Sequence, residues 1–165
     1  MKVQDVMTGD VHTCRPDTNL SMAAMQMWDG DFGVLPVESG GRIVGLITDR
    51  DICMAAATKH CDPATIQVDE VITGQVHSCS PDTDIREALK VMQRNKVRRL
   101  PVINPNDKKL VGMLSLNDVA LNAQADATAE LNAQDVEDTL KAICEHRKPA
   151  PVAIPFQQGV RQLVA

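Results

Sequence analysis

Two short stretches place a hydroxyl and a carboxylate at the same spacing. Residues 45–52 read GLITDRDI and residues 112–119 read GMLSLNDV. In each, the apolar residues predict a strand that runs into a helix, with Thr48 or Ser115 at the helix start. The free N–H groups and partial positive charge of a helix start suit a phosphate. A carboxylate one turn later, Asp51 or Asp118, suits a pair of ribose hydroxyls.

A simpler interpretation is that these side chains are helix caps, because Thr, Ser and Asp are common there. Both aspartates, however, follow the hydroxyl by three residues, which is later than we expect for a capping residue. Together with the duplication of the stretch, this spacing favours ligand contacts in one cleft or in both.

An internal repeat relates the two stretches. Residues 6–37 and 71–102 align without a gap, with 14 identities in 32 positions. Both copies contain Leu-Pro-Val near the end of this alignment, and the second copy then gains two residues in a turn. The order of so many shared features indicates a duplication of a unit of about 65 residues.

Each copy predicts a βαββα unit. A first helix is indicated by apolar residues at i, i+3, i+4 and i+7, starting at Leu20 and at Ile85. The other predicted elements are short strands at 11–13 and 76–78, hairpins over 34–48 and 99–115, and second helices over 49–57 and 116–123. One copy is too small to be stable alone, so we expect an α+β fold with the two copies packed sheet to sheet about a pseudo-twofold axis.

The predicted organisation is a first repeat (1–57), a linker (58–67), a second repeat (68–123) and a C-terminal helix and tail (124–165). An amphipathic helix is expected over 127–147, with Cys144 on its apolar side. Residues 148–165 contain three prolines and are expected to be extended. They are too apolar for a purely solvated tail, so docking on the core or on another subunit is expected.

The composition excludes several classes of function. A net charge of −5 and 2% aromatic residues argue against a nucleic-acid binder. No apolar run approaches the roughly 20 residues of a membrane helix, and the N-terminus lacks a signal-peptide profile, so a cytoplasmic protein is expected. Five cysteines are an odd count that fits reduced thiols. No catalytic constellation is recognisable, and we expect no enzyme.

A duplicated His-x-Cys pair is the candidate for a metal. His12 and Cys14 in the first copy, and His77 and Cys79 in the second, form a possible Cys₂His₂ zinc site if the pseudo-twofold axis brings them together. Alternating residues of a short strand, with the cysteines turned inward, explain the pattern equally well. We interpret the pairs as structural and keep zinc as a minor hypothesis.

The chain resembles tandem cystathionine-β-synthase (CBS) domains, known as a Bateman module. The resemblance lies in the paired openings VMT and VIT, in TDRDI, in VRRLPV and in the Gly-x-x-Ser-x-x-Asp ending of the second copy. It covers residues 1–122 and implies two clefts between paired sheets, frequent binding of adenine-containing ligands and dimerisation into a flat disk. Many bacterial members are small proteins that consist of this module alone.

On the matching motif, the resemblance implies phosphate and ribose contacts by Thr48, Asp51, Ser115 and Asp118. It implies phosphate contact by at least one of Arg98 and Arg99, whose guanidinium groups suit phosphate oxygens. The alternative for the two arginines is an exposed edge paired with carboxylates. The first copy has Gly33 and Val34 at these places, so the two clefts are expected to be unequal.

The resulting hypothesis is a regulatory homodimer that binds AMP, ADP or ATP as a regulatory ligand, has no resident cofactor and signals to an effector protein in trans. A ligand-free structural or stress-related dimer is the alternative from another class, and a zinc-binding protein is the third.

Overall fold

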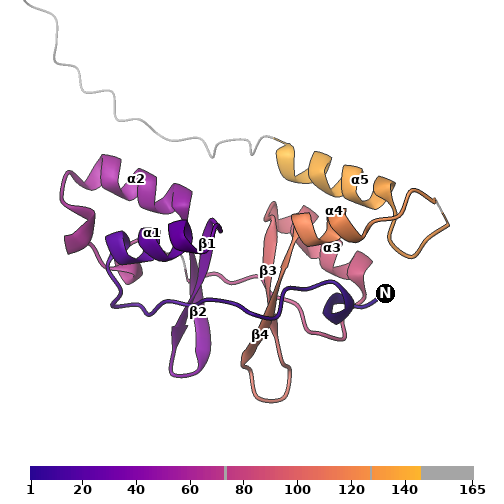
Figure 1. The fold of residues 1–165 in the computed structure, drawn as a ribbon, viewed down its shortest axis with the longest axis horizontal. Coiled ribbons are helices and arrows are strands. Elements are labelled where there is room, and N and C mark those ends of the chain that lie inside the picture. Colours follow the sequence, from indigo (N-terminus) through magenta and orange to yellow (C-terminus); the bar gives the residue numbers. More distant parts are fainter. Residues whose placement is uncertain (73, 127, 146–165) are drawn as a thin grey trace, which may run out of the picture.

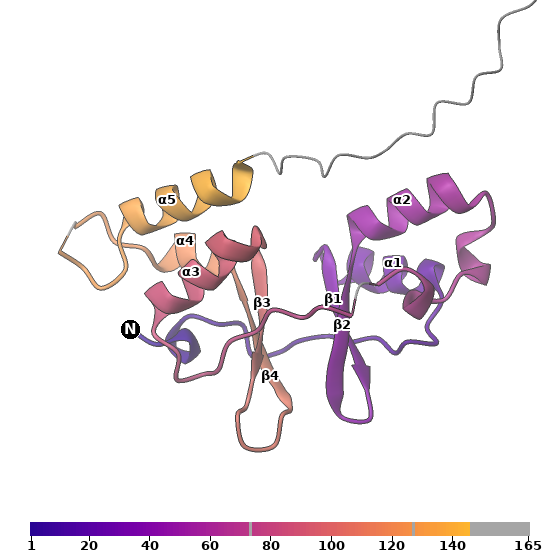
Figure 2. The ribbon, with the colours of Figure 1, turned by 180° about the vertical axis from the view of Figure 1, so that it is seen from behind.

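Two antiparallel hairpins form the centre of the protein, and helices flank them on the outer sides (Figures 1 and 2). The computed structural model describes residues 1–72, 74–126 and 128–145. In repeat 1, β1 (Val34–Ser39) pairs with β2 (Arg42–Thr48); in repeat 2, β3 (Arg99–Ile103) pairs with β4 (Leu110–Ser115). The β1–β2 turn requires its glycines, because Gly40 and Gly41 have φ angles of 59° and 77°.

Each hairpin carries two helices, as the apolar pattern predicts. Repeat 1 has α1 (Leu20–Asp29) and α2 (Asp49–Lys59), and repeat 2 has α3 (Ile85–Asn95) and α4 (Leu116–Asn122). The inner stripes are buried: Leu20, Ala23 and Met27 on α1, and Ile85, Ala88, Leu89 and Met92 on α3. Short 3₁₀ turns lie at Val3–Asp5 (η1), Pro63–Thr65 (η2) and Val68–Glu70 (η3). The predicted α+β fold is confirmed.

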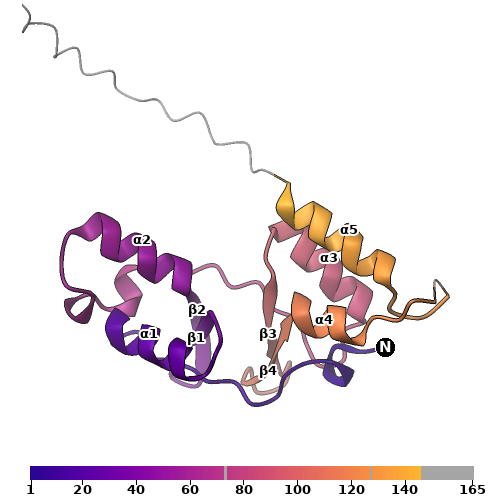
Figure 3. The same cartoon turned by 45° about the horizontal axis from the view of Figure 1, so that its top comes forward.

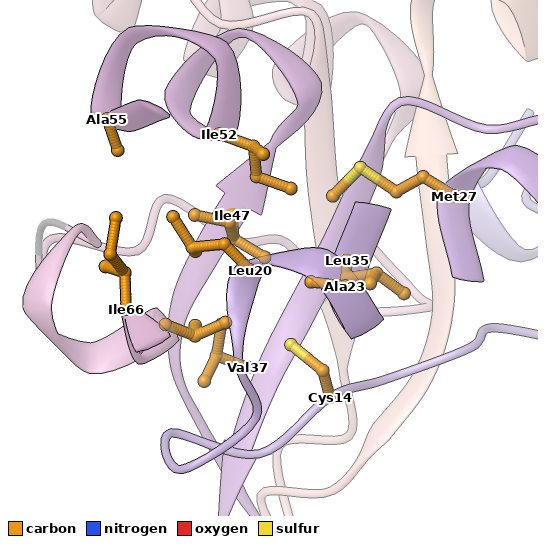
Figure 4. Close-up of a cluster of buried hydrophobic side chains, with 11 residues drawn as sticks. Cys14, Leu20, Ala23, Met27, Leu35, Val37, Ile47, Ile52, Ala55 and Ile66 are labelled. Atoms are coloured by element: carbon orange, nitrogen blue, oxygen red, sulfur yellow. The ribbon is translucent and has the colours of Figure 1, made fainter. Parts of the chain in front are cut away.

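The two repeats exchange short segments to complete their cores. Val3, near the N-terminus, is fully buried in the core of repeat 2, and Thr8 exchanges two backbone hydrogen bonds with Met113 of β4. Conversely, Ile66 and Val68 are buried in the core of repeat 1, where the Leu20 N–H donates to the Ile66 carbonyl (Figure 4). Each core therefore contains residues from the segment that leads into the other repeat.

The short strands expected at 11–13 and 76–78 are not formed, and this prediction is wrong. In the described residues there is one parallel bridge in each copy, Cys14 with Val37 and Cys79 with Val102. Prolines explain why the pairing stops there, because a proline has no N–H to donate. In repeat 1, Pro36 and Pro16 occupy the two positions where the ladder would need its next donors; Pro101 and Pro81 do so in repeat 2.

The C-terminal helix, α5, extends over Ala133–Cys144 and packs on α3 (Figure 3). It is shorter than predicted, although residues 127 and 146–147 of the predicted range lie outside the described residues. Val136 and Ile143 pack on the core of repeat 2, but Cys144 is exposed. Its expected place on the apolar side is therefore wrong, because the buried side of α5 is centred on Thr139.

The prediction for residues 148–165 lies outside the described residues. In the described part of the chain, no helix has the length and apolarity that crossing a membrane requires.

Candidate functional site

The hydroxyl and carboxylate of each duplicated stretch form a helix capping box. In repeat 2, Ser115 Oγ and N donate to Asp118 Oδ2 at 2.6 and 2.7 Å, and Asp118 N donates back to Ser115 Oγ at 3.2 Å. Thr48 and Asp51 make the same three contacts in repeat 1. The prediction that these aspartates come too late to be caps is wrong, because the third residue of a helix is where a capping box places its acid.

Asp118 has a second oxygen that lies in a cleft. Thr8 Oγ1 donates to Asp118 Oδ1 over a long 3.4 Å, and both residues line a cleft of about 250 Å³. The cleft draws on both repeats: Val11, Phe32 and Val34 come from the first, and Arg99, Ser115 and Asp118 from the second. Three of the predicted ligand residues therefore meet in one place.

Arg99 is the one basic residue of the predicted pair that lines this cleft. It is the first residue of β3, is half-buried, and stands opposite Ser115 in the strand register. Arg98 is exposed, and its carbonyl accepts the Leu116 N–H. Arg98 lines a different cleft, beside α5, which Arg99 and Ser115 also line.

The carboxylate pairing that the alternative expects for the two arginines is not found among the described residues. Within the part of the chain that the structure describes, no carboxylate forms an ion pair with Arg98 or Arg99. The Arg99 guanidinium is thus available to an anion in the cleft.

The start of α4 offers fewer free donors than the sequence suggested. Asp118 N is bonded to Ser115 Oγ, and Leu116 N is bonded to the Arg98 carbonyl. An anion in this cleft would therefore depend mainly on the Arg99 side chain.

Thr48 and Asp51 are half-buried at the start of α2 and are not among the residues that line this cleft. Repeat 1 also differs from repeat 2 at Gly33, which corresponds to Arg98. At Gly33, a Cβ atom would lie 2.8 Å from Asp49 Oδ2, so a side chain there would displace that carboxylate. The two repeats are unequal at the places corresponding to Arg98 and Arg99.

Sequence reasoning missed part of the cleft wall. Phe32 and Asp31 follow α1, and Asp31 has a φ angle of 53° in the left-handed region. Thr8 reaches the cleft through the exchanged N-terminal segment. The sequence does contain a signal that could have indicated Thr8, because Thr8 belongs to the VMT opening of the repeat. No periodic pattern marks Asp31 or Phe32.

The His-x-Cys pairs do not come together as the zinc hypothesis requires. Cys14 is buried in the core of repeat 1, whereas Cys79 packs against the core of repeat 2. Burial raises the pKa of each thiol to about 11, which opposes the thiolate form that binds zinc. His12 packs against Phe32 instead. Among the described residues, no three His, Cys, Asp or Glu side chains form a cluster that could hold a metal.

The two repeats, the hairpin and helix order in each and the cleft between them define a tandem domain pair. The chain belongs to the CBS domain family, whose model matches residues 3–58 and 68–123.

Curated relatives of similar length share this organisation. The CBS domain-containing protein YhcV of Bacillus subtilis is 33% identical over 127 residues, which are 77% of this chain and 89% of that protein. Hypoxic response protein 1 of Mycobacterium tuberculosis is 30% identical over 142 residues, 86% of this chain and 92% of the relative.

Solved structures show the same fold. A crystal structure of Hypoxic Response Protein I, described with two coordinated zinc ions, has a TM-score of 0.67 at 30% identity and covers 75% of this chain and 100% of that one. The CBS domain pair of protein MJ0100, in complex with 5′-methylthioadenosine and S-adenosyl-L-methionine, has a TM-score of 0.66 at 21% identity. The matched region covers 73% of this chain and 94% of the MJ0100 chain.

Proposed function

We propose that this chain is a regulatory module that binds an adenosine-containing ligand in the cleft lined by Arg99, Ser115 and Asp118. One observation carries the proposal: a carboxylate, a hydroxyl and a guanidinium that forms no ion pair with the described residues lie together with apolar side chains on a single cleft between the repeats. The MJ0100 domain pair, which holds adenosine compounds, supports this class of ligand by analogy of fold only.

The adenine, ribose and phosphate of such a ligand each have suitable residues in the cleft lining. The adenine ring would lie against Val11, Phe32 and Val34, which are the apolar part of the lining. The ribose hydroxyls would donate to Asp118 Oδ1 in place of its long contact with Thr8. A phosphate would accept from Arg99 in a charge-assisted hydrogen bond.

The charges of the cleft favour a ligand with a single phosphate. Asp10, Asp31 and Asp118 contribute three carboxylates to the lining, against the one guanidinium of Arg99. Each added phosphate would bring further negative charge close to these carboxylates. We therefore rank AMP above ADP and ATP.

The remaining predicted contacts lie away from this cleft, and we propose further sites for them. Thr48 and Asp51 repeat the capping geometry of Ser115 and Asp118, and we propose them as ribose and phosphate contacts of a site in repeat 1. Arg98, exposed on the cleft beside α5, is a further candidate for phosphate contact. A homodimer in the cytoplasm, signalling to an effector protein, completes the proposal. The signal is limited to the difference in the ligand's affinity for two conformations.

Thermal unfolding with and without millimolar adenosine, AMP, ADP, ATP and zinc tests the proposal. AMP should raise the midpoint most, because a ligand at a hundredfold excess over its Kd stabilises the folded state by about 2.7 kcal/mol. No shift with any nucleoside or nucleotide would favour the ligand-free structural dimer. A shift with zinc alone would favour the metal-binding alternative.

A further inference from the structure

A groove of about 470 Å³ is lined by both helices of repeat 1 and by the first residue of β3, Arg99. Among the described residues, Trp28 and Phe32 are the only Trp, Tyr or Phe side chains, and both line this groove. The rest of its apolar wall is formed by Ala24, Met27 and Ile52. Aromatic and apolar side chains gathered in one open groove are typical of a surface that binds a chain segment.

The polar part of the groove is acidic apart from Arg99. Asp31 and Asp49 contribute two carboxylates to the lining. Within the part of the chain that the structure describes, neither carboxylate forms an ion pair. The groove therefore suits a segment that combines apolar side chains with positive charge and has main-chain carbonyls to which the Arg99 guanidinium can donate.

The segment of residues 146–165 has this composition. It contains three of the 17 Lys and Arg residues of the chain and none of the 22 Asp and Glu residues, so it is basic while the rest of the chain is acidic. Residues 149–156 read PAPVAIPF. Proline-rich sequences favour an extended helix without internal hydrogen bonds, and aromatic-lined grooves are the surfaces that bind such sequences.

Glu145, the last residue before this segment, lies close to the groove. The C-terminal end of α5 is the end nearer to repeat 1 (Figures 1 and 3). The Glu145 carbonyl accepts from Lys96 Nζ at 2.9 Å, and Lys96 precedes Arg99 by three residues. An extended chain advances about 3.3 Å per residue, so residues 149–156 are within reach of the groove.

The corresponding place in repeat 2 is covered by the chain that follows the repeat. Val136 and Leu140 of α5 line the cleft there, and Gln93, which corresponds to Trp28, donates to Thr139 of α5 at 2.8 Å. The matching residues that line the two places are Gly33 and Arg98, Asp49 and Leu116, and Cys53 and Ala120. Each repeat thus has a face that can take an additional segment, and the described residues cover it only in repeat 2.

We propose that residues 147–156 of the same chain bind in the groove of repeat 1. The basic residues at the start of this stretch pair with the two groove carboxylates. The apolar side chains that follow pack on the two aromatic rings, and the Arg99 guanidinium donates to main-chain carbonyls. The opposite charges of this stretch and of the acidic chain favour the contact.

This contact regulates the ligand cleft, a consequence that rests on the proposed function. Asp31, Phe32 and Arg99 line both the groove and the cleft. Because the same N–H groups of Arg99 cannot serve main-chain carbonyls and a phosphate at once, AMP and the segment compete for them. Each therefore lowers the affinity of the other for the protein.

Cys53 is exposed and lines the groove, so thiol cross-linking locates the segment directly. In the full chain, Ile154→Cys places a thiol in the proposed stretch. A short thiol–thiol cross-linker and mass spectrometry then measure the rates of its joining to Cys53 and to exposed Cys61, which does not line the groove. Leu163→Cys is the matched control, at an apolar residue of the same segment outside the stretch. Mixing isotope-labelled and unlabelled protein separates links within one chain from links between chains.

The expected result is a link within one chain from position 154 to Cys53 that forms at least about tenfold faster than the link to Cys61, because binding raises the effective concentration of the thiol. Leu163→Cys should show no such preference. Equal rates at the two cysteines would overturn the proposal. A Cys53 link found only between chains would also overturn it, because the segment would then belong to another copy.

None of these outcomes requires a ligand, so they are independent of the proposed function. The regulation is tested by repeating the measurement with saturating AMP once calorimetry has shown that AMP binds. AMP should then slow the link between position 154 and Cys53. An unchanged rate would overturn the competition for Arg99.

Discussion

Asp118 uses its two carboxylate oxygens for different purposes. Oδ2 accepts from the Ser115 backbone and hydroxyl and thereby caps α4, whereas Oδ1 lies in the cleft with only a long contact to Thr8. The main role of the Asp118 carboxylate and the Ser115 hydroxyl is therefore to cap the helix. The same capping box recurs at Asn132 and Asp135 of α5, where the sequence suggested no ligand at all. The spacing alone therefore does not signal a ligand site, and the proposed site depends on the cleft around Asp118.

Among single residues, Arg99 is the proposed phosphate contact. Arg99→Gln should therefore weaken AMP binding and leave the binding of adenosine, which has no phosphate, nearly unchanged. A hydrogen bond to a charged group contributes about 1.5–3 kcal/mol, so the loss in AMP affinity should be about 10- to 100-fold. Calorimetric titration of both ligands measures the two effects. Arg94→Gln is the matched control, because Arg94 is an exposed arginine of α3 that does not line this cleft. Equal losses for AMP and adenosine would show that Arg99 acts on the shape of the cleft and not on a phosphate.

The buried thiols give a pH prediction. Cys14 and Cys79 have their pKa values raised to about 11 by burial, whereas Cys53, Cys61 and Cys144 are exposed. At pH 8 a disulfide reagent should modify the exposed thiols quickly and the other two slowly, because the thiolate is the reactive form. The slow rate should rise as the pH approaches 11. Fast modification of Cys14 at pH 8, located by mass spectrometry, would contradict this account.

At the scale of elements, the exchanged segments hold the two repeats together. Ile66 is 2% exposed in the core of repeat 1, although it precedes repeat 2 in the sequence. Ile66→Ala should lower the free energy of unfolding by about 2–5 kcal/mol, measured by urea denaturation. Leu121→Ala, at an exposed site, should change it by less than about 0.5 kcal/mol. Similar values for the two variants would mean that Ile66 is not part of a packed core.

The repeat was predictable from the identities between its two copies, and the hairpins and helices were predictable from local patterns of apolar and turn residues. The apolar stripe from Ile85 to Met92 is an example. The exchange of Val3 and Ile66 between the cores was not predictable, because it depends on contacts between distant segments. For the site, the motif identified Ser115 and Asp118, but Asp31 and Phe32 enter the cleft through a turn that no pattern marks.

At the scale of the whole molecule, the two repeats have the same fold and different surroundings. The outer face of repeat 2 is covered by α5, and that of repeat 1 carries exposed Trp28. The cleft between them is lined by residues of both repeats, with Phe32 and Val34 from the first and Arg99 and Asp118 from the second. A duplicated fold can therefore place the same elements in two different surroundings.

The most direct measurement compares Asp118→Asn with Asp51→Asn in calorimetric titrations with AMP. Each variant disrupts the capping box of its own repeat, and the two boxes have the same geometry. Each variant should therefore lower the free energy of unfolding by a similar, small amount of about 1 kcal/mol. Asp118 lines the cleft and Asp51 does not. The account predicts that Asp118→Asn loses at least tenfold in affinity at this cleft, while Asp51→Asn retains a site of wild-type affinity. Unchanged AMP binding by a folded Asp118→Asn protein would contradict it.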